Sequence, residues 1–164
     1  MRLMTPSLLS VHEIGHAVVA ERLDKTVQQI GIDGEEGWTI AHWPDRNWDV
    51  DRFRAEAAIA YAGIAAEILF LLKAKEQEAA REVESDPLNA NDQQLFLLAA
   101  MKTGGAPGQE RKAAMIRARD VLNSHWSQLL SLATLLDERG QLSGDELRQG
   151  LARPTPQGAN KAAG

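Results

Sequence analysis

The 164-residue sequence contains no cysteine, and this absence limits both its covalent structure and its metal chemistry. No disulfide can form, and no thiolate is available to bind a metal. Any metal site must therefore be built from histidine and carboxylate side chains. A chain of this length can bury a proper hydrophobic core without disulfides, so we expect a single domain.

Basic residues and long apolar runs are also scarce. Eighteen Lys and Arg against 23 Asp and Glu give a formal net charge of −5, with no basic cluster, which argues against a general nucleic-acid binder. No apolar run reaches the roughly 18 residues that span a bilayer, and the longest, residues 64–72, is interrupted by Glu67. The first residues lack the layout of a signal peptide. We therefore expect a cytoplasmic protein with no nucleic-acid partner and no membrane span.

Near its start the sequence carries an H-E-x-x-H motif, His12-Glu13-Ile14-Gly15-His16. Residues four apart lie on one face of a helix, so His12 and His16 can point the same way and hold one zinc ion. Glu13 could then reach a water beside the metal and take its proton. The motif predicts His12 and His16 as metal ligands and Glu13 as a general base.

A structural interpretation of the motif competes with the catalytic one. Ser10 and Glu13 fit the S-x-x-E capping box of a helix start, with each histidine a hydrogen-bonded residue on a half-buried helix. Thr5-Pro6 offers an earlier start, which would place the motif in mid-helix and remove the capping role of Glu13. Gly15 costs about 1 kcal/mol relative to Ala in a helix interior, so it indicates another backbone packed close by.

The spacing of apolar residues predicts a mainly α-helical fold with one small β-hairpin. Two short runs, residues 27–32 and 38–43, are expected as the strands, joined by a turn. Helices are expected over residues 6–24, 52–82, 91–102, 110–137 and 143–151. Residues 152–164 are small and polar, and we expect them to form a disordered tail after a domain of residues 1–151.

A catalytic zinc site needs a third protein ligand, and the spacing of residues leaves its identity open. His42 is expected at the hairpin edge, and His125 is expected as a hydrogen-bonded residue on an apolar helix. The better candidates are four carboxylates, Glu56, Glu67, Asp86 and Asp92. Glu67 stands alone in an apolar stretch and needs a partner, either the metal or a ligand histidine. Asp92 is otherwise an ordinary carboxylate at a helix start.

Four segments, in order, resemble the peptidase domain of the FtsH family of ATP-dependent zinc metalloproteases. They are residues 12–19 (HEIGHAVV), 37–39 (GWT) with Pro44, 61–67 (YAGIAAE) and 91–94 (NDQQ). The part from Arg119 to Leu147 also follows the family's last helices, so the resemblance covers roughly residues 5–151. It implies a zincin-like helical bundle in which zinc is bound by His12, His16 and Asp92, with Glu13 as the general base.

The sequence also departs from the family's pattern. It contains no Walker A motif, and Ile64, Ile68 and Gln93 replace the family's Arg, Glu and Leu. We therefore expect a stand-alone, ATP-independent zinc endopeptidase that cuts unfolded or flexible polypeptides, which the 38–43 strand could hold by strand addition. A homo-oligomer or a separate ATPase partner would be consistent with the resemblance. The alternatives are a non-catalytic binding or regulatory module stabilised by zinc, and a helical interaction domain without metal.

Overall fold

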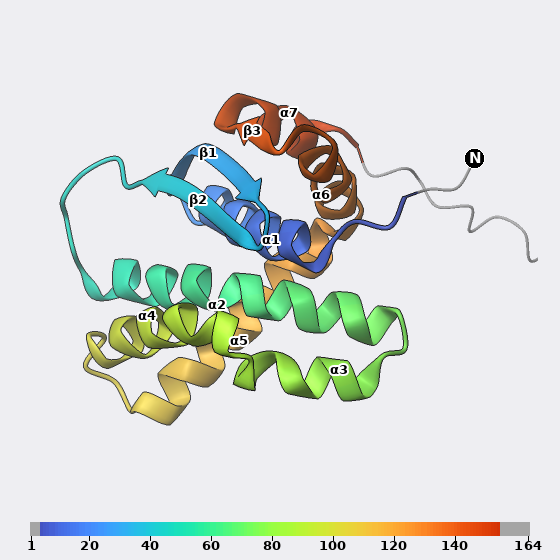
Figure 1. Ribbon diagram of the computed structural model, residues 1–164. Helices are drawn as coiled ribbons and strands as arrows, with labels where there is room; N and C mark the ends of the chain where they lie inside the picture. The colour runs from blue at the N-terminus through green and yellow to red at the C-terminus, as the bar shows by residue number, and fades with distance from the viewer. Residues whose placement is uncertain (1–3, 155–164) are drawn as a thin grey trace, which may run out of the picture.

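Helix α1 (Leu8–Arg22) runs through the middle of the fold, with a small sheet on one side and helix α2 on the other (Figure 1). The computed structural model describes residues 4–154. Ten of the 15 residues of α1 are buried, as expected for a central helix. Its N-cap is Ser7, whose hydroxyl accepts a hydrogen bond from the Ser10 amide. The capping box at Ser10 is therefore wrong, and Glu13 lies inside the helix.

The predicted hairpin is confirmed, and it belongs to a three-stranded antiparallel sheet. Strands β1 (Thr26–Asp33) and β2 (Glu36–His42) form the hairpin, and β3 (Gln141–Ser143) pairs with the other side of β1, giving the order β2-β1-β3. The sequence analysis missed β3, because a three-residue strand directly before a helix has no readable alternation. Strand β2 is left at the edge of the sheet, beside α1 (Figure 1).

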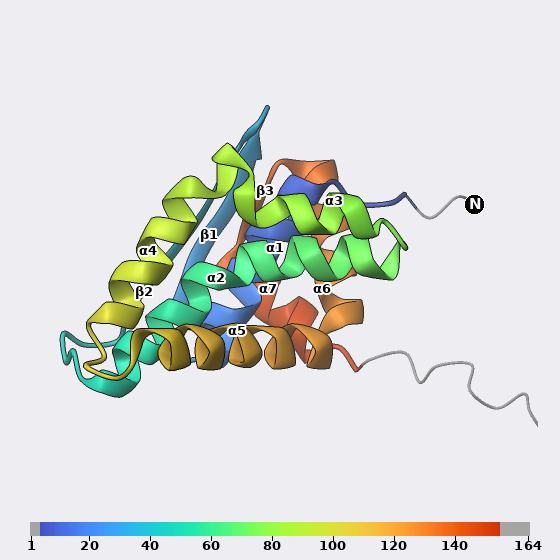
Figure 2. The same ribbon diagram turned by 90° about the horizontal axis from the view of Figure 1, so that it is seen from below.

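The helix predicted over residues 52–82 is two helices. Helix α2 (Val50–Lys73) is capped by Asp49 and ends before Lys75, which adopts a positive φ of 64°. The chain then reverses into α3 (Gln77–Glu82), which lies beside α2 in both ribbon views (Figures 1 and 2). Two short 3₁₀ turns, Val83–Ser85 and Pro87–Asn89, lead into α4 (Ala90–Met101).

The helix predicted over residues 110–137 is also two helices, α5 (Pro107–Ser124) and α6 (Trp126–Arg139). The break falls at His125, and no glycine or proline at that position predicts it from the sequence. Gly140 ends α6 in the left-handed conformation, with φ 76°. Helix α7 (Gly144–Ala152) follows with a capping box, and it includes Ala152, which had been assigned to the tail. The rest of the predicted tail, from residue 155, lies outside the described residues.

The close backbone contact predicted at Gly15 is present. A β-carbon on Gly15 would lie 2.6 Å from Cβ of Ala66 and 2.9 Å from the carbonyl oxygen of Ala62, both on α2. Small residues therefore let α1 and α2 pack backbone to backbone. This contact brings the face of α1 that carries His12 and His16 directly against α2.

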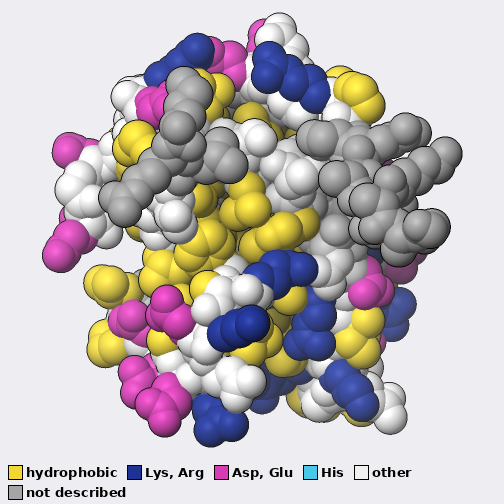
Figure 3. Space-filling model, turned by 90° about the vertical axis from the view of Figure 1, so that its right-hand side faces the viewer, with side chains coloured by type: hydrophobic (Ala, Val, Ile, Leu, Met, Phe, Trp, Pro, Cys, Tyr) yellow, Lys and Arg dark blue, Asp and Glu magenta, His cyan; other side chains and the backbone are white. Residues whose placement is uncertain are grey.

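Among the described helices, α2 is the one that is long and apolar enough to cross a membrane, although the sequence analysis had found no such stretch. Two thirds (67%) of its apolar window is buried within the protein, which is also what a core helix shows. Figure 3 shows the side of the molecule that lies to the right in Figure 1, where apolar side chains gather in a central strip with Lys and Arg beside it. No histidine is visible on the described part of that face.

Candidate metal centre and general base

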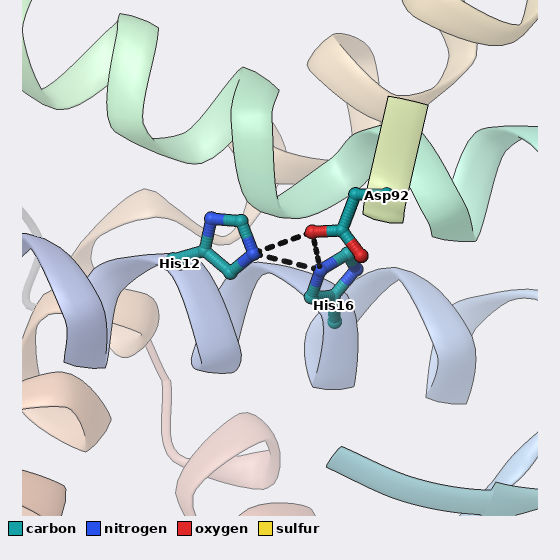
Figure 4. Close-up of side chains that lie close together, drawn as sticks. All are labelled: His12, His16 and Asp92. Atoms are coloured by element: carbon teal, nitrogen blue, oxygen red, sulfur yellow. Dashed lines mark hydrogen bonds and ion pairs between the residues drawn. The ribbon is translucent and has the colours of Figure 1, made fainter. Parts of the chain in front are cut away.

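Side chains from α1 and α4 converge at one point between the two helices (Figure 4). His12 and His16 project from successive turns of α1, and Asp92 reaches them from the first turn of α4. Oδ2 of Asp92 lies 2.7 Å from Nε2 of His12 and 3.0 Å from Nε2 of His16. The two Nε2 atoms are 3.0 Å apart. The structure thus brings together the three residues that the FtsH resemblance named as zinc ligands.

Asp92 is held in place by the packing of α4 and the turns before it against α2. Phe96, one turn after Asp92, is fully buried with its ring centroid 5.1 Å from that of Tyr61. The Tyr61 hydroxyl donates a hydrogen bond to Glu84 at 2.7 Å, and the buried Asn89 amide donates to the Val83 carbonyl at 2.9 Å. These contacts fix the start of α4, and with it the Asp92 carboxylate.

Nδ1 of each histidine, the ring nitrogen that does not face Asp92, has its own hydrogen-bond acceptor. Nδ1 of His16 lies 2.7 Å from the Ile59 carbonyl oxygen, and Nδ1 of His12 lies 2.5 Å from Oε1 of Glu67. Because a carbonyl and an ionised carboxylate only accept, both Nδ1 atoms are assigned as protonated donors. When the rings are neutral, both Nε2 atoms direct their lone pairs toward Asp92, which is the tautomer that metal-binding histidines use.

This donor set fits a small divalent cation. Two imidazole nitrogens and a carboxylate oxygen lie within 3.0 Å of one another, so a proton or a metal ion placed among them would be stabilised by all three. Zinc with ligands at about 2.0–2.1 Å needs its ligand atoms roughly 3.3 Å apart, which requires an expansion of only a few tenths of an ångström here. Nitrogen and oxygen ligands of this kind are used by zinc and by other first-row divalent metals.

Gly63 on α2 provides the space for the site. A β-carbon at this position would lie 2.5 Å from Nε2 of His12 and 2.5 Å from Nε2 of His16, closer than any real side chain can approach. The face of α2 above the histidines is therefore bare backbone. Gly63 thus lies directly over the Nε2 atoms of His12 and His16.

Hydrogen bonds between the histidines and the carboxylates shift the pKa values of His12 and Asp92. Burial would lower the pKa of His12, but hydrogen bonds to Asp92 and Glu67 outweigh it and raise the pKa to about 10. Burial would raise the pKa of Asp92, but hydrogen bonds from His12 and His16 hold it well below its usual value. A proton on Nε2 of His12 and a divalent metal ion are therefore alternative occupants of the same space.

Glu13 is buried beside the hairpin, where a general base would have to lie. Its Oε2 accepts a hydrogen bond from the Thr39 hydroxyl at 2.9 Å. A β-carbon on Gly37 would lie 2.6 Å from Oε1 of Glu13, so strand β2 passes directly over the carboxylate. Glu13 makes no capping interaction, and its carboxylate is held by Thr39, a contact that the sequence analysis did not find.

Two cavities open on either side of this centre. One, of about 490 Å³, extends past His16, and the other, of about 600 Å³, extends past His12. Their linings share Glu13, Gly37, Asn91 and Asp92. The candidate metal ligands and the candidate base therefore line open spaces from which a ligand could reach them.

The other residues considered as ligands lie elsewhere or act differently. Glu67 binds Nδ1 of His12, which is one of its two predicted roles. Glu56 pairs with Lys25, and Asp86 caps the turn before α4. His42 is exposed at the end of β2, as predicted.

The prediction for His125 is wrong. It was expected as a hydrogen-bonded histidine within a long helix. It lies instead at the break between α5 and α6, and its buried Nδ1 has no hydrogen-bond partner among residues 4–154. Burial lowers the pKa of His125, and the positive charge of Arg22 lowers it further, so the ring stays neutral at neutral pH.

Comparison of the chain with protein-family models finds no match, and comparison with curated proteins finds none. The resemblance to the FtsH family therefore rests on the ordered segments quoted above. What can be argued about function comes from the geometry of His12, His16, Asp92 and Glu13.

Proposed function

We propose that the protein is a zinc-dependent metalloendopeptidase with a zincin-like, FtsH-like catalytic domain. One observation carries the proposal, the convergence of His12 Nε2, His16 Nε2 and Asp92 Oδ2 within 3.0 Å of one another. Three protein ligands with a fourth position left for water are typical of catalytic zinc, whereas structural zinc sites are closed by four. The open cavities beside the site favour the catalytic type.

The residues of the chain have distinct roles in this mechanism. Zinc, when bound by His12, His16 and Asp92, supplies a Lewis acid that polarises a carbonyl and lowers the pKa of water toward about 7. Glu13 takes the proton of the attacking water and returns it to the leaving amine. Thr39 holds one oxygen of the Glu13 carboxylate, which leaves the other free to face the water. Glu67 orients His12 and raises its basicity through Nδ1.

Strand β2 offers a place for the substrate backbone. It is the outer strand in the order β2-β1-β3, and Gly37 and Thr39 on it adjoin Glu13. An extended peptide added to this edge would run past Glu13 and join the two cavities. Because only an extended segment can be bound in this way, the substrates are unfolded or flexible polypeptides.

The test combines metal analysis with peptide hydrolysis. Purified protein should contain about one zinc per chain and cleave casein or unstructured peptides, with activity lost to a chelator and restored by zinc. Glu13→Gln should keep the zinc and lose at least 100-fold in kcat. The matched control is Glu78→Gln, an exposed residue of α3 far along the chain from the site, which should keep full activity.

Each of the other outcomes would indicate a different function for this protein. Equal activity in the native protein and Glu13→Gln would remove Glu13 from the role of base. Stoichiometric zinc with no turnover on any peptide would indicate a binding or regulatory module that keeps zinc for its shape. Absence of zinc after purification, with no loss of thermal stability on chelation, would indicate a helical interaction domain.

A further inference from the structure

The cavity on the His16 side has walls that the hydrolysis of a peptide bond does not itself need. Away from the metal ligands its walls are mainly apolar and aromatic, formed by Trp48, Phe53, Ile59, Leu95 and Leu98. Its volume of about 490 Å³ lies in the range of roughly 300–1,000 Å³ that binding pockets show. A large apolar side chain would bury these walls on binding.

The aromatic part of this lining is preassembled. The ring of Trp48 lies 5.2 Å from that of Phe53 and 6.4 Å from that of Trp43. The Arg52 guanidinium lies over the Trp43 ring at 4.8 Å, which helps to hold the group together. Trp48 is nevertheless 48% exposed, so a broad aromatic surface faces the open cavity. A substrate ring would stack there in offset or edge-to-face geometry.

A carboxylate with one unused oxygen interrupts the apolar lining. Oε1 of Glu56 accepts hydrogen bonds from Lys25 Nζ and from the Trp43 indole, each at 2.5 Å. Oε2 of Glu56 has no hydrogen-bond partner among residues 4–154 and is not sealed from solvent. It offers a charged acceptor to a hydroxyl donor on an otherwise apolar ligand.

Charge decides which ligand suits this lining. Lys25 already neutralises Glu56, and Lys102 brings a second positive charge to the same cavity, with its Nζ 5.6 Å from the Phe53 ring. A substrate Lys or Arg would therefore gain little there. Acidic side chains would meet the carboxylates of Glu13 and Asp92. A neutral aromatic ring with a hydroxyl at its end satisfies both the walls and the free oxygen.

We propose that this cavity receives an aromatic side chain of the substrate next to the scissile bond, and that Glu56 favours tyrosine over phenylalanine. The proposal rests on the peptidase function above for the position of the scissile bond. It adds a substrate class and names Glu56 as the residue that determines specificity.

The binding test uses Glu13→Gln protein loaded with zinc, so that binding is measured without cleavage. Blocked Gly/Ser peptides carry a single Tyr, Phe, Ala or Lys, which is then the only anchor, and binding is followed by tryptophan fluorescence. We expect Phe to bind at least tenfold more tightly than Ala, and Tyr about fivefold more tightly than Phe. Lys should bind no better than Ala. Equal affinity for the four peptides would overturn the proposal.

Two variants locate the effect. Glu56→Gln replaces the charged acceptor by a neutral amide, so the preference for Tyr over Phe should fall to about twofold or less while the preference for Phe over Ala persists. Ala41→Phe should block the cavity, because Ala41 lines it from β2. The matched control is Ile40→Phe on the same strand, since Ile40 points to the other face and is 40% exposed. An unchanged ratio in Glu56→Gln would overturn its role.

Cleavage of the same peptides by the native protein tests the proposed specificity separately from the proposed peptidase function. Cuts next to Tyr and Phe are expected. Cleavage without any aromatic preference would overturn the assignment of the cavity and leave the peptidase function standing. Aromatic-selective binding with no cleavage of any peptide would overturn the peptidase function, and with it the position assigned to the scissile bond.

Discussion

The Thr39 hydroxyl lies 2.9 Å from Oε2 of Glu13 and so ties the edge strand of the sheet to the candidate base. The same hydroxyl lies 3.1 Å from the Glu13 main-chain carbonyl, so it is anchored at the base of that residue as well as at its tip. The hairpin therefore sets the direction in which the carboxylate points.

Thr39→Val should lower kcat about tenfold with little change in KM, because the carboxylate loses its orienting hydrogen bond while the peptide-binding edge is kept. Thr39→Ser keeps the hydroxyl and should restore most of the rate. Steady-state kinetics on one unstructured peptide makes the comparison. An equal loss in both variants would show that the hydroxyl alone does not preserve the rate, and it would contradict the orienting role of this hydrogen bond.

Glu67→Gln should weaken zinc binding by roughly tenfold, because a neutral amide oxygen supports the Nδ1 proton of His12 less well than a carboxylate. Competition with a fluorescent chelator measures the affinity. Glu78→Gln, which removes the same charge from an exposed site, serves as the control. If zinc affinity fell equally in the control, the effect would be due to the change in net charge and not to the contact with His12.

Gly63→Ala should abolish zinc binding while the protein stays folded. The added methyl group would overlap Nε2 of both histidines, at 2.5 Å, and must push α1 and α2 apart or turn the rings away. Gly108→Ala is the matched control, since a β-carbon there meets no atom within 4 Å. Metal content after dialysis, with circular dichroism to verify folding, gives the result. Retained zinc in Gly63→Ala would contradict the geometry.

Asp137→Ala should destabilise the fold by about 1–3 kcal/mol. Its carboxylate accepts hydrogen bonds from the Ser7 amide at 2.7 Å, the Ser7 hydroxyl at 2.6 Å and the Ser10 hydroxyl at 2.5 Å, which joins α6 to the start of α1. Ser10 is fully buried, so its hydroxyl would lose its partner. Urea unfolding measures the change, and the exposed neighbour Glu138→Ala should shift the midpoint little.

Zinc affinity should rise with pH through the neutral and mildly alkaline range. Because the pKa of His12 is raised to about 10, its ring holds a proton that zinc must displace, so affinity gains about tenfold per pH unit below that value. Calorimetry in buffers of different ionisation enthalpy counts the proton released. In the metal-free protein the same raised pKa stabilises the fold fully below about pH 6.5, and this contribution is lost as pH rises toward about 10.

The candidate site was more predictable from sequence than the helix boundaries. The i, i+4 spacing placed His12 and His16 together because helix geometry alone fixes it. Asp92 lies 80 residues beyond His12, and spacing could not single it out among four carboxylates. The family resemblance named it, and its contact with both histidines agrees. Glu67 was identified as needing a partner, because a lone carboxylate in an apolar stretch is costly.

Features that depend on tertiary contacts were not predictable. The breaks at Lys75 and His125 carry no glycine or proline, so local propensity favours a continuous helix through each. Strand β3 exists because β1 offers a free edge. The role of Thr39 depends on the way the hairpin folds over α1, and a contact between distant elements leaves no periodic signal in the sequence.

The candidate metal ligands come from two helices that are far apart in the chain, since Asp92 follows His16 by 76 positions. An ion bound there would cross-link two distant parts of the chain. It would stabilise the fold partly by restricting the conformations of the unfolded chain. Any excursion of α4 away from α2 would carry Asp92 with it. In the proposed peptidase, a movement of α4 that widened the cavity would also remove one ligand from the ion, so substrates would have to bind with α4 in place.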